Sequence, residues 1–250
     1  MTRILLDIET VPEWLNPPTS DVPTPLPWEF TTSAEARRRE KAPVRWAKID
    51  DMRAKAPDQS LWAPEYQKEL LEVDALAEKL AMEGALDPLE GRIVAIGVQV
   101  AGDRGSRFLF SAPEAAYESF ILTECARWLA EHDAWTLVTY CGSGFDIPYL
   151  RFRMLKHQIP WSGGVARHVD LSFELPCVRG YTRWKEGQAG PLQVPRLSAV
   201  CTALGLPPTD DLPGSEVPRL VRKGRLDEVN RHLGCDLDRL DFLDMRLGRP

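Results

Sequence analysis

The chain has 250 residues, of which 44% are hydrophobic and 27% are charged, a balance typical of one well-packed globular domain. Its formal net charge of −6 argues against a protein that holds nucleic acid through a broad basic surface. It does not argue against contact through metal ions bound to acidic side chains. The sequence has no apolar run long enough to cross a membrane and no signal-peptide pattern, so we expect a cytoplasmic protein. Five cysteines without a CxxC pair and only four histidines favour neither a disulfide framework nor a zinc site.

The first predicted element is a strand over residues 4–10, in which two carboxylates interrupt an apolar run. Side chains alternate along a strand, so Asp7 and Glu9 project from one side while Leu6 and Ile8 project from the other. Two like charges on one face repel each other unless a cation lies between them. A bound divalent metal would supply that cation, whereas an edge-strand pair facing water would need none. This stretch alone leaves both interpretations open.

Residues 12–88 are predicted to form a long insertion after this strand. The insertion begins with a proline-rich run, which excludes a regular helix or a central strand. Two helix-prone segments follow, near residues 33–53 and 64–82. We therefore expect the core of a single domain over residues 1–250 to resume only after this insertion.

The rest of the chain alternates between strand and helix patterns. A strand is predicted from Arg92 to Val100, with a hairpin partner over residues 107–110 across the turn at Gly102 to Gly105. An amphipathic helix is predicted over residues 113–132. Its expected apolar face contains Phe120, Ile121, Cys125, Trp128 and Leu129.

Further predicted elements are a strand over 136–141, a helix from about residue 146, a strand over 168–171, a loop over 176–192, and helices over 197–204, 216–222 and 226–247. This order predicts the α/β class, with one sheet as the organising element.

The last predicted helix carries an acid inside its apolar stripe. The stripe contains Val229, Leu233, Leu240, Leu243 and Leu247, and the position that completes it is Asp236. A lone buried carboxylate is costly unless it is paired or binds a metal. His232 lies one turn earlier on nearly the same face. Asp238, Asp241 and Asp244 fall off the stripe and are predicted to face solvent.

Asp146 is the third notable acid. It follows the carboxyl end of the strand over 136–141, where α/β proteins tend to place their sites. An aspartate here is also a good helix N-cap, and this stretch taken alone favours the N-cap interpretation over a site residue.

Three motifs, in this order along the chain, resemble those of a known protein family. They are Asp7-Ile8-Glu9-Thr10, the stretch from Tyr140 to Leu150 (YCGSGFDIPYL), and His232-Leu233-Gly234-Cys235-Asp236. Together they resemble the motifs of the DEDD superfamily of 3'-5' exonucleases, which have a ribonuclease H-like fold. The likeness is greatest to stand-alone bacterial exonucleases related to the proofreading domain of family-B DNA polymerases. Three segments before the third motif add to it, at residues 204–207, 214–217 and 224–229.

The resemblance implies a mixed central sheet flanked by helices and a metal-dependent nuclease that acts on nucleic acid with a free 3' end. We expect single-stranded DNA as this substrate. It implies two Mg²⁺ or Mn²⁺ ions held by Asp7, Glu9, Asp146 and Asp236, with Asp7 bridging them. His232 would orient or deprotonate the attacking water. The partner classes it suggests are this substrate and a replication or repair protein.

Thr10 and Phe145 adjoin motif acids, where they would meet the terminal nucleotide; a core position is the alternative for Phe145. Two residues depart from the family pattern. His232 stands where members with this spacing usually have tyrosine, and Cys141 stands where asparagine is common. The competing hypothesis is a catalytically silent module that binds nucleic acid or a partner protein. Silent modules usually lack one or more of the four acids, and this chain has all four.

Overall fold

The computed structural model of the protein describes residues 2–13, 15, 67–68, 82–132, 135–161, 165–175, 184–185, 188–189, 194–207, 209–210 and 212–248. Most of the predicted insertion, including nearly all of its two helix-prone segments, lies outside the described residues. The same holds for most of the predicted loop over 176–192, of which only the two-residue strands β6 (Trp184–Lys185) and β7 (Gln188–Ala189) are described.

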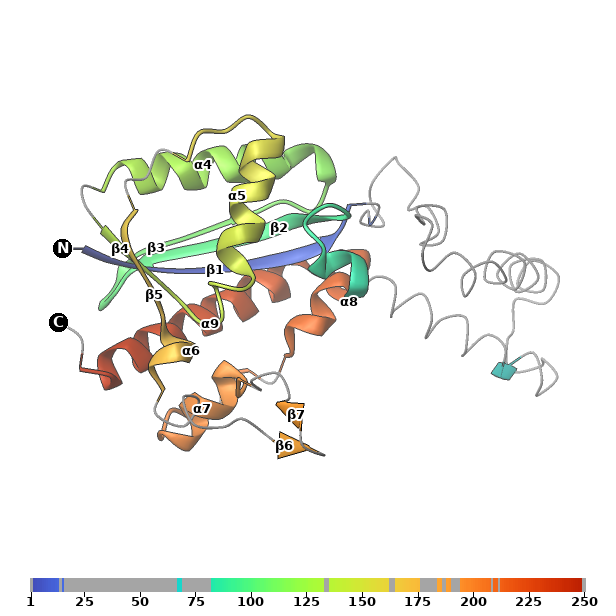
Figure 1. Ribbon diagram of the computed structural model, residues 1–250. Helices are drawn as coiled ribbons and strands as arrows, with labels where there is room; N and C mark the ends of the chain where they lie inside the picture. Colours follow the sequence, from blue (N-terminus) through green and yellow to red (C-terminus); the bar gives the residue numbers. More distant parts are fainter. Residues whose placement is uncertain are drawn as a thin grey trace, which may run out of the picture.

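A mixed five-stranded sheet organises the fold, in the order β3-β2-β1-β4-β5 (Figure 1). Its strands are β1 (Thr2–Pro12), β2 (Gly91–Val100), β3 (Asp103–Ser111), β4 (Trp135–Thr139) and β5 (Val165–Asp170). The first three pair antiparallel, while β1, β4 and β5 run parallel. β1 therefore lies at the centre, between the antiparallel and the parallel half.

Helices cover both faces of this sheet (Figure 1). On one face lie α4 (Glu118–Ala130), preceded by η3 (Ala115–Tyr117), and α5 (Asp146–Lys156). The other face is covered by α9 (Leu226–Arg246), together with α7 (Leu197–Ala203) and α8 (Val217–Arg222), which η4 (Gly214–Glu216) precedes. The short α6 (Leu171–Glu174) follows β5 directly. The predicted α/β class with a mixed sheet flanked by helices is thus confirmed.

The alternation predicted for the first strand decides which face carries the acids. Ile4, Leu6 and Ile8 are buried in the core between the sheet and α4 and α5. Leu5 and Val11 pack on the opposite side, in clusters that include residues of α8 and α9. Asp7 and Glu9 share the parity of Leu5 and Val11, so they lie on the side of α9.

One glycine lets α9 approach this side of the sheet closely. Gly97 of β2 pairs with Asp7 of β1, and a Cβ atom built on it would lie 2.9 Å from Leu237 Cδ1 and 3.0 Å from Leu233 Cγ. A larger residue would push the helix away from the strands. The residues of α9 that flank this contact, among them His232 and Asp236, are thereby held near the two acids of β1.

The strand predictions hold with shifted ends. β3 begins four residues before the predicted start, because the chain turns already at Gly102, whose φ is +79°. β4 ends at Thr139, so that Cys141 belongs to the following loop. Leu171, predicted to end a strand, opens α6, because the Asp170 side chain accepts a hydrogen bond from the Ser172 amide and caps that helix.

The helix predictions contain two errors. Phe120, expected on the apolar face of α4, is 60% exposed, whereas the other four residues of that predicted face are buried. Asp241 and Asp244, expected to face solvent, are buried, and Asp238 is largely covered.

The buried acids of α9 dock the helix on the strands. The Asp241 carboxylate accepts a hydrogen bond of 2.8 Å from the Gly102 amide. Asp244 pairs with Arg3 of β1, and Asp238 pairs with Arg107 of β3. An apolar stripe alone could not reveal these contacts, because their partners come from distant strands.

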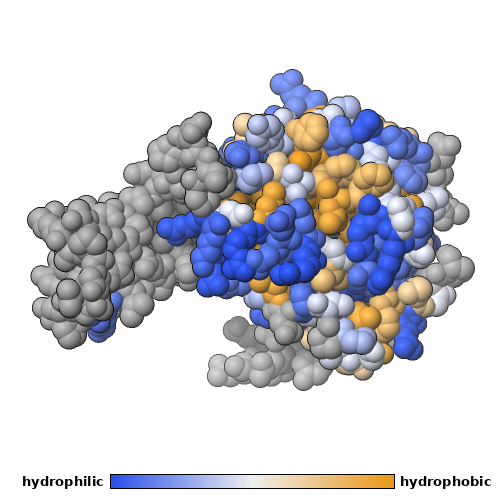
Figure 2. Space-filling view, turned by 180° about the vertical axis from the view of Figure 1, so that it is seen from behind, coloured by the Kyte–Doolittle hydropathy of each residue, from blue (hydrophilic) through white to orange (hydrophobic). Residues whose placement is uncertain are grey.

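The reverse side of the molecule shows hydrophobic residues between groups of hydrophilic ones (Figure 2). Among the described residues, no helix is long and apolar enough to span a membrane.

Candidate metal centre

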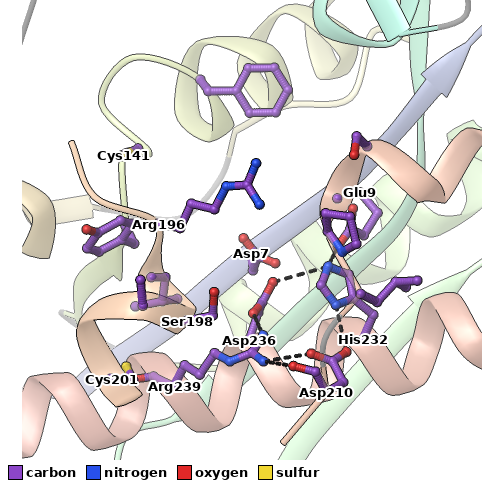
Figure 3. A pocket seen from close by; sticks show the side chains of 18 of the residues that line it. Asp7, Glu9, Cys141, Arg196, Ser198, Cys201, Asp210, His232, Asp236 and Arg239 are labelled. Atoms are coloured by element: carbon purple, nitrogen blue, oxygen red, sulfur yellow. Dashed lines mark hydrogen bonds and ion pairs between the residues drawn. The ribbon is translucent and has the colours of Figure 1, made fainter. Parts of the chain in front are cut away.

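A pocket of about 1150 Å³ opens beside β1, where the loop before α5, the segment that enters α7 and the face of α9 come together (Figure 3). It is lined by every residue that the sequence predicts for the site: Asp7, Glu9, Thr10, Phe145, Asp146, His232 and Asp236. Residues far apart in the sequence are thus brought to one cavity.

The two acids of β1 are held in an unfavourable electrostatic environment. Desolvation by the surrounding protein raises the pKa of Asp7 well above its ordinary value, and repulsion from Asp236, Asp146 and Glu9 adds to the effect. The pKa of Glu9 is raised for the same reasons, with desolvation first. The edge-strand interpretation is wrong, because β1 is central and Glu9 is only 7% exposed.

Asp146 also faces this cluster instead of capping its helix. Phe145 is the N-cap of α5, and it makes no side-chain capping hydrogen bond, so the N-cap interpretation of Asp146 is wrong. Burial, followed by the charges of Asp170 and Asp236, raises the pKa of Asp146 to about 8. Its carboxylate enters the site at the first residue of the helix.

The loop before Asp146 is fixed by a second acid. Both oxygens of Asp170 accept backbone hydrogen bonds of 2.9 Å, from the amides of Cys141 and Ser143. Cys141 adopts a left-handed conformation, with φ of 61°. A Cβ atom on Gly142 would lie 2.1 Å from Thr139 Oγ1, so only glycine fits this turn.

From α9, His232 and Asp236 reach the same place. Nε2 of His232 lies 3.5 Å from Glu9 Oε1 and 3.5 Å from Asp236 Oδ2. One ligand atom from each of these three residues lies within 4.8 Å of the other two. His232 is 3% exposed, which excludes the role of a surface helix residue.

Sequence reasoning missed two residues of the site. Asp210 accepts a hydrogen bond of 2.8 Å from His232 Nδ1, and Arg239 donates to both the side chain and the backbone carbonyl of Asp210 at 2.7 Å. Arg239 also pairs with Asp236. Its position three residues after Asp236 on one helix was an available signal, whereas Asp210 lies in a loop without any helical or strand pattern to mark it.

The three other predicted acids of the pocket have no arginine partner in the part of the chain that the structure describes, whereas Asp236 has Arg239. Among the residues that the structure describes, neither Asp7 nor Asp146 has an ion-pair partner, and Glu9 has only the imidazole of His232. Carboxylate oxygens are the ligands that Mg²⁺ and Mn²⁺ prefer. The donor set and its missing positive charge therefore fit divalent cations, which Asp7, Glu9, Asp146 and Asp236 would hold.

Three further side chains shape the pocket around the acids. Phe145 packs on Tyr149, at 5.3 Å between ring centroids, and also lines the cavity, so it belongs to the core and to the site. Thr10 is buried at the pocket wall. Arg196, an exposed residue just before α7, extends into the space above Asp7 (Figure 3).

Comparison with known proteins agrees with this architecture. Residues 80–231, more than half of the chain, match the RNase H superfamily, and the chain belongs to this superfamily. The matched range contains Asp146 and Asp210 but ends just before His232 and Asp236, and it begins after the acids of β1. A search of curated proteins found no match.

Among solved structures, the fold is similar to the family B DNA polymerase from the hyperthermophilic archaeon Pyrobaculum calidifontis. The TM-score is 0.55 and the sequence identity is 16%; the alignment covers 99% of this chain and 24% of the polymerase. The chain thus spans about a quarter of the polymerase's length, and the likeness concerns the fold alone.

Proposed function

We propose that the protein is a metal-dependent 3'-5' exonuclease of the DEDD type that hydrolyses phosphodiester bonds of nucleic acid, with single-stranded DNA as the preferred substrate. The observation that carries the proposal is the group of desolvated carboxylates in one pocket, of which two lack any cationic partner among the described residues. The RNase H superfamily fold supports it, because the acids lie on the central strand and on the helices that pack beside it.

In this proposal Asp7, Glu9, Asp146 and Asp236 hold two Mg²⁺ or Mn²⁺ ions. When bound, such ions supply an activated water and stabilise the leaving 3'-oxygen. The chain itself keeps Asp7, Glu9 and Asp146 desolvated and all four carboxylates in place before an ion arrives, and His232 orients the attacking water. Mutual repulsion of the acids then favours cation binding.

The walls of the pocket would receive the substrate. The half-buried ring of Phe145 offers a stacking surface for the terminal base, and Thr10 also lines the pocket. Arg196, at the rim, is placed to meet a phosphate oxygen. The negative net charge of the chain suits this local mode of binding. We place this activity in the cytoplasm and in one domain, with a replication or repair protein as the partner class.

The test uses 3'-labelled and 5'-labelled single-stranded DNA and RNA with Mg²⁺, Mn²⁺ or EDTA. Wild-type protein should release mononucleotides from the 3' end only when metal is present, and Asp7→Ala should release none. Asp238→Ala, which removes an acid of α9 outside the pocket, should cleave like wild type. Binding of the oligonucleotides without cleavage in either metal would overturn the proposal and favour the silent module.

A further inference from the structure

The imidazole of His232 is held in one orientation by residues outside the metal ligands. Its ring is buried, and Nδ1 is hydrogen-bonded to Asp210 Oδ2 at 2.8 Å. Asp210 is itself fixed by Arg239, whose guanidinium donates to it at 2.7 Å. A carboxylate accepts a hydrogen bond, so Nδ1 carries the proton and the lone pair of the neutral ring is at Nε2.

That lone pair is directed at the acids. Nε2 lies at the same distance, 3.5 Å, from an oxygen of Glu9 on β1 and from an oxygen of Asp236 on α9. This spacing is longer than a normal hydrogen bond of about 2.7–3.2 Å. Ligand atoms that share one cation at about 2.1 Å lie roughly 3.0–3.4 Å apart. Both distances from Nε2 are therefore close to those between ligands of a common ion, and all three atoms lie within 4.8 Å of one another.

From this geometry we infer that His232 is a direct nitrogen ligand of one of the two cations, completed by Glu9 and Asp236, and that Asp210 is its positioning residue. The inference rests on the proposed function and specifies how His232 acts: it orients the attacking water by binding the ion, not by accepting a proton from it. The hydrogen bond from Nδ1 to the Asp210 carboxylate fixes the orientation of the ring for this role.

A nitrogen ligand changes which ion the site selects. Imidazole binds Mn²⁺ and later transition metals readily, whereas Mg²⁺ favours oxygen donors and keeps its waters. His232 therefore biases this centre toward Mn²⁺ over Mg²⁺. Replacing His232 by glutamine should weaken Mn²⁺ binding on the order of 10–100-fold and Mg²⁺ binding by less.

The decisive measurement is pulsed EPR of Mn²⁺ bound to the whole protein, free of nucleic acid. A coordinated imidazole gives a directly bound ¹⁴N coupling, and labelling wild-type protein with ¹⁵N-histidine should convert it to the ¹⁵N pattern. His232→Gln should abolish the coupling. His132→Gln should keep it, because His132 bonds to the Trp128 carbonyl on α4 and lies outside the pocket.

Asp210→Asn tests the positioning role of Asp210 separately from metal binding by His232. It should keep the nitrogen coupling but lower Mn²⁺ affinity on the order of 10-fold, measured by titration calorimetry. The isotope experiment uses wild-type protein, so its result remains valid even if a variant fails to fold.

The outcomes distinguish this inference from the function on which it rests. Mn²⁺ bound without nitrogen coupling, in a protein that still cleaves from the 3' end, would overturn the ligand role of His232 alone. A protein that binds no Mn²⁺ would overturn both the metal centre and the inference.

Discussion

Two polar clusters in this molecule, one built on the single buried carboxylate of Glu118 and one on the acids of the pocket, have opposite electrostatics. Glu118, at the start of α4, is 1% exposed and accepts hydrogen bonds from Arg153 and from the Ile93 amide. Burial would raise the pKa of Glu118, but these bonds and the charge of Arg153 bring it below its ordinary value. In the pocket, burial and repulsion act together, and the pKa values of Asp7, Glu9 and Asp146 rise.

The difference lies in where the positive charge comes from. α5 supplies Arg153 to Glu118, so the first cluster is complete within the fold and serves to join α4, α5 and β2. The same helix begins with Asp146, which faces three other acids of the pocket instead of an arginine. The fold leaves the second cluster short of positive charge, as a cation-binding site requires.

The largest effect should come from removing one acid of the pocket. Asp146→Asn should lower metal-dependent cleavage by about 10³-fold, because about 4 kcal/mol of transition-state stabilisation is lost with the ion. In EDTA at pH 8 the same variant should be more stable than wild type, since a repelling charge is gone. Urea unfolding beside the cleavage assay tests both. A variant that is less stable in EDTA would contradict the idea that the carboxylate is strained.

Removing the buried charge of the first cluster should have the opposite effect on stability. Glu118→Gln leaves the buried guanidinium of Arg153 with only the more distant carboxylate of Glu13, at 3.8 Å, among the described residues, and should cost about 3–5 kcal/mol of unfolding free energy. Mn²⁺ affinity of the folded variant should stay that of wild type, because Glu118 does not line the pocket. Urea unfolding in EDTA and calorimetric titration with Mn²⁺ check the two statements. A drop in Mn²⁺ affinity would show that the clusters are coupled.

The pH dependence of stability sharpens the comparison. The folded pKa of Asp146 is about 8, above its ordinary 3.8, so the folded protein binds more protons than the unfolded chain in this range. Stability in EDTA should therefore fall as the pH rises from 5 to 8, by up to about 1.4 kcal/mol per pH unit for each proton. Glu118 contributes little here, because its pKa is lowered in the folded protein and its carboxyl is mostly ionised in both states above pH 5.

Divalent cations should make the unfolding free energy less dependent on pH. In the absence of metal, Asp146→Asn should also reduce the slope of stability against pH. Chemical denaturation at several pH values, with EDTA or Mn²⁺, measures both effects. A stability in EDTA that is constant or increases between pH 5 and 8 would contradict the raised pKa.

The local parts of this site could be predicted from the sequence, and its long-range contacts could not. Strand alternation gave the common face of Asp7 and Glu9, and helix periodicity gave His232 and Asp236 as neighbours in a buried stripe. Asp210 was not predicted, because its role depends on a contact between its loop and His232 of α9, twenty-two residues later. Asp241 and Asp244 were misassigned for the same reason: their partners, Gly102 and Arg3, are distant in sequence.

The smallest effect should come from Asp238, an acid of α9 whose ion pairs lie at the protein surface. Asp238 pairs with Arg107 and with Arg104, whose side chain is 72% exposed, so water and salt screen much of the interaction. Asp238→Asn should cost less than about 1 kcal/mol. Asp244→Asn should cost more, because that carboxylate is 4% exposed and accepts two hydrogen bonds from Arg3.

Measuring both variants in 0.05 and 0.5 M salt separates screening from burial, because only the cost of Asp238→Asn should shrink at high salt. Equal costs at both salt concentrations would mean that the helix is docked by Asp238 as firmly as by Asp244. In that case, exposure would not explain which acids of α9 hold the helix on the sheet beside the metal centre.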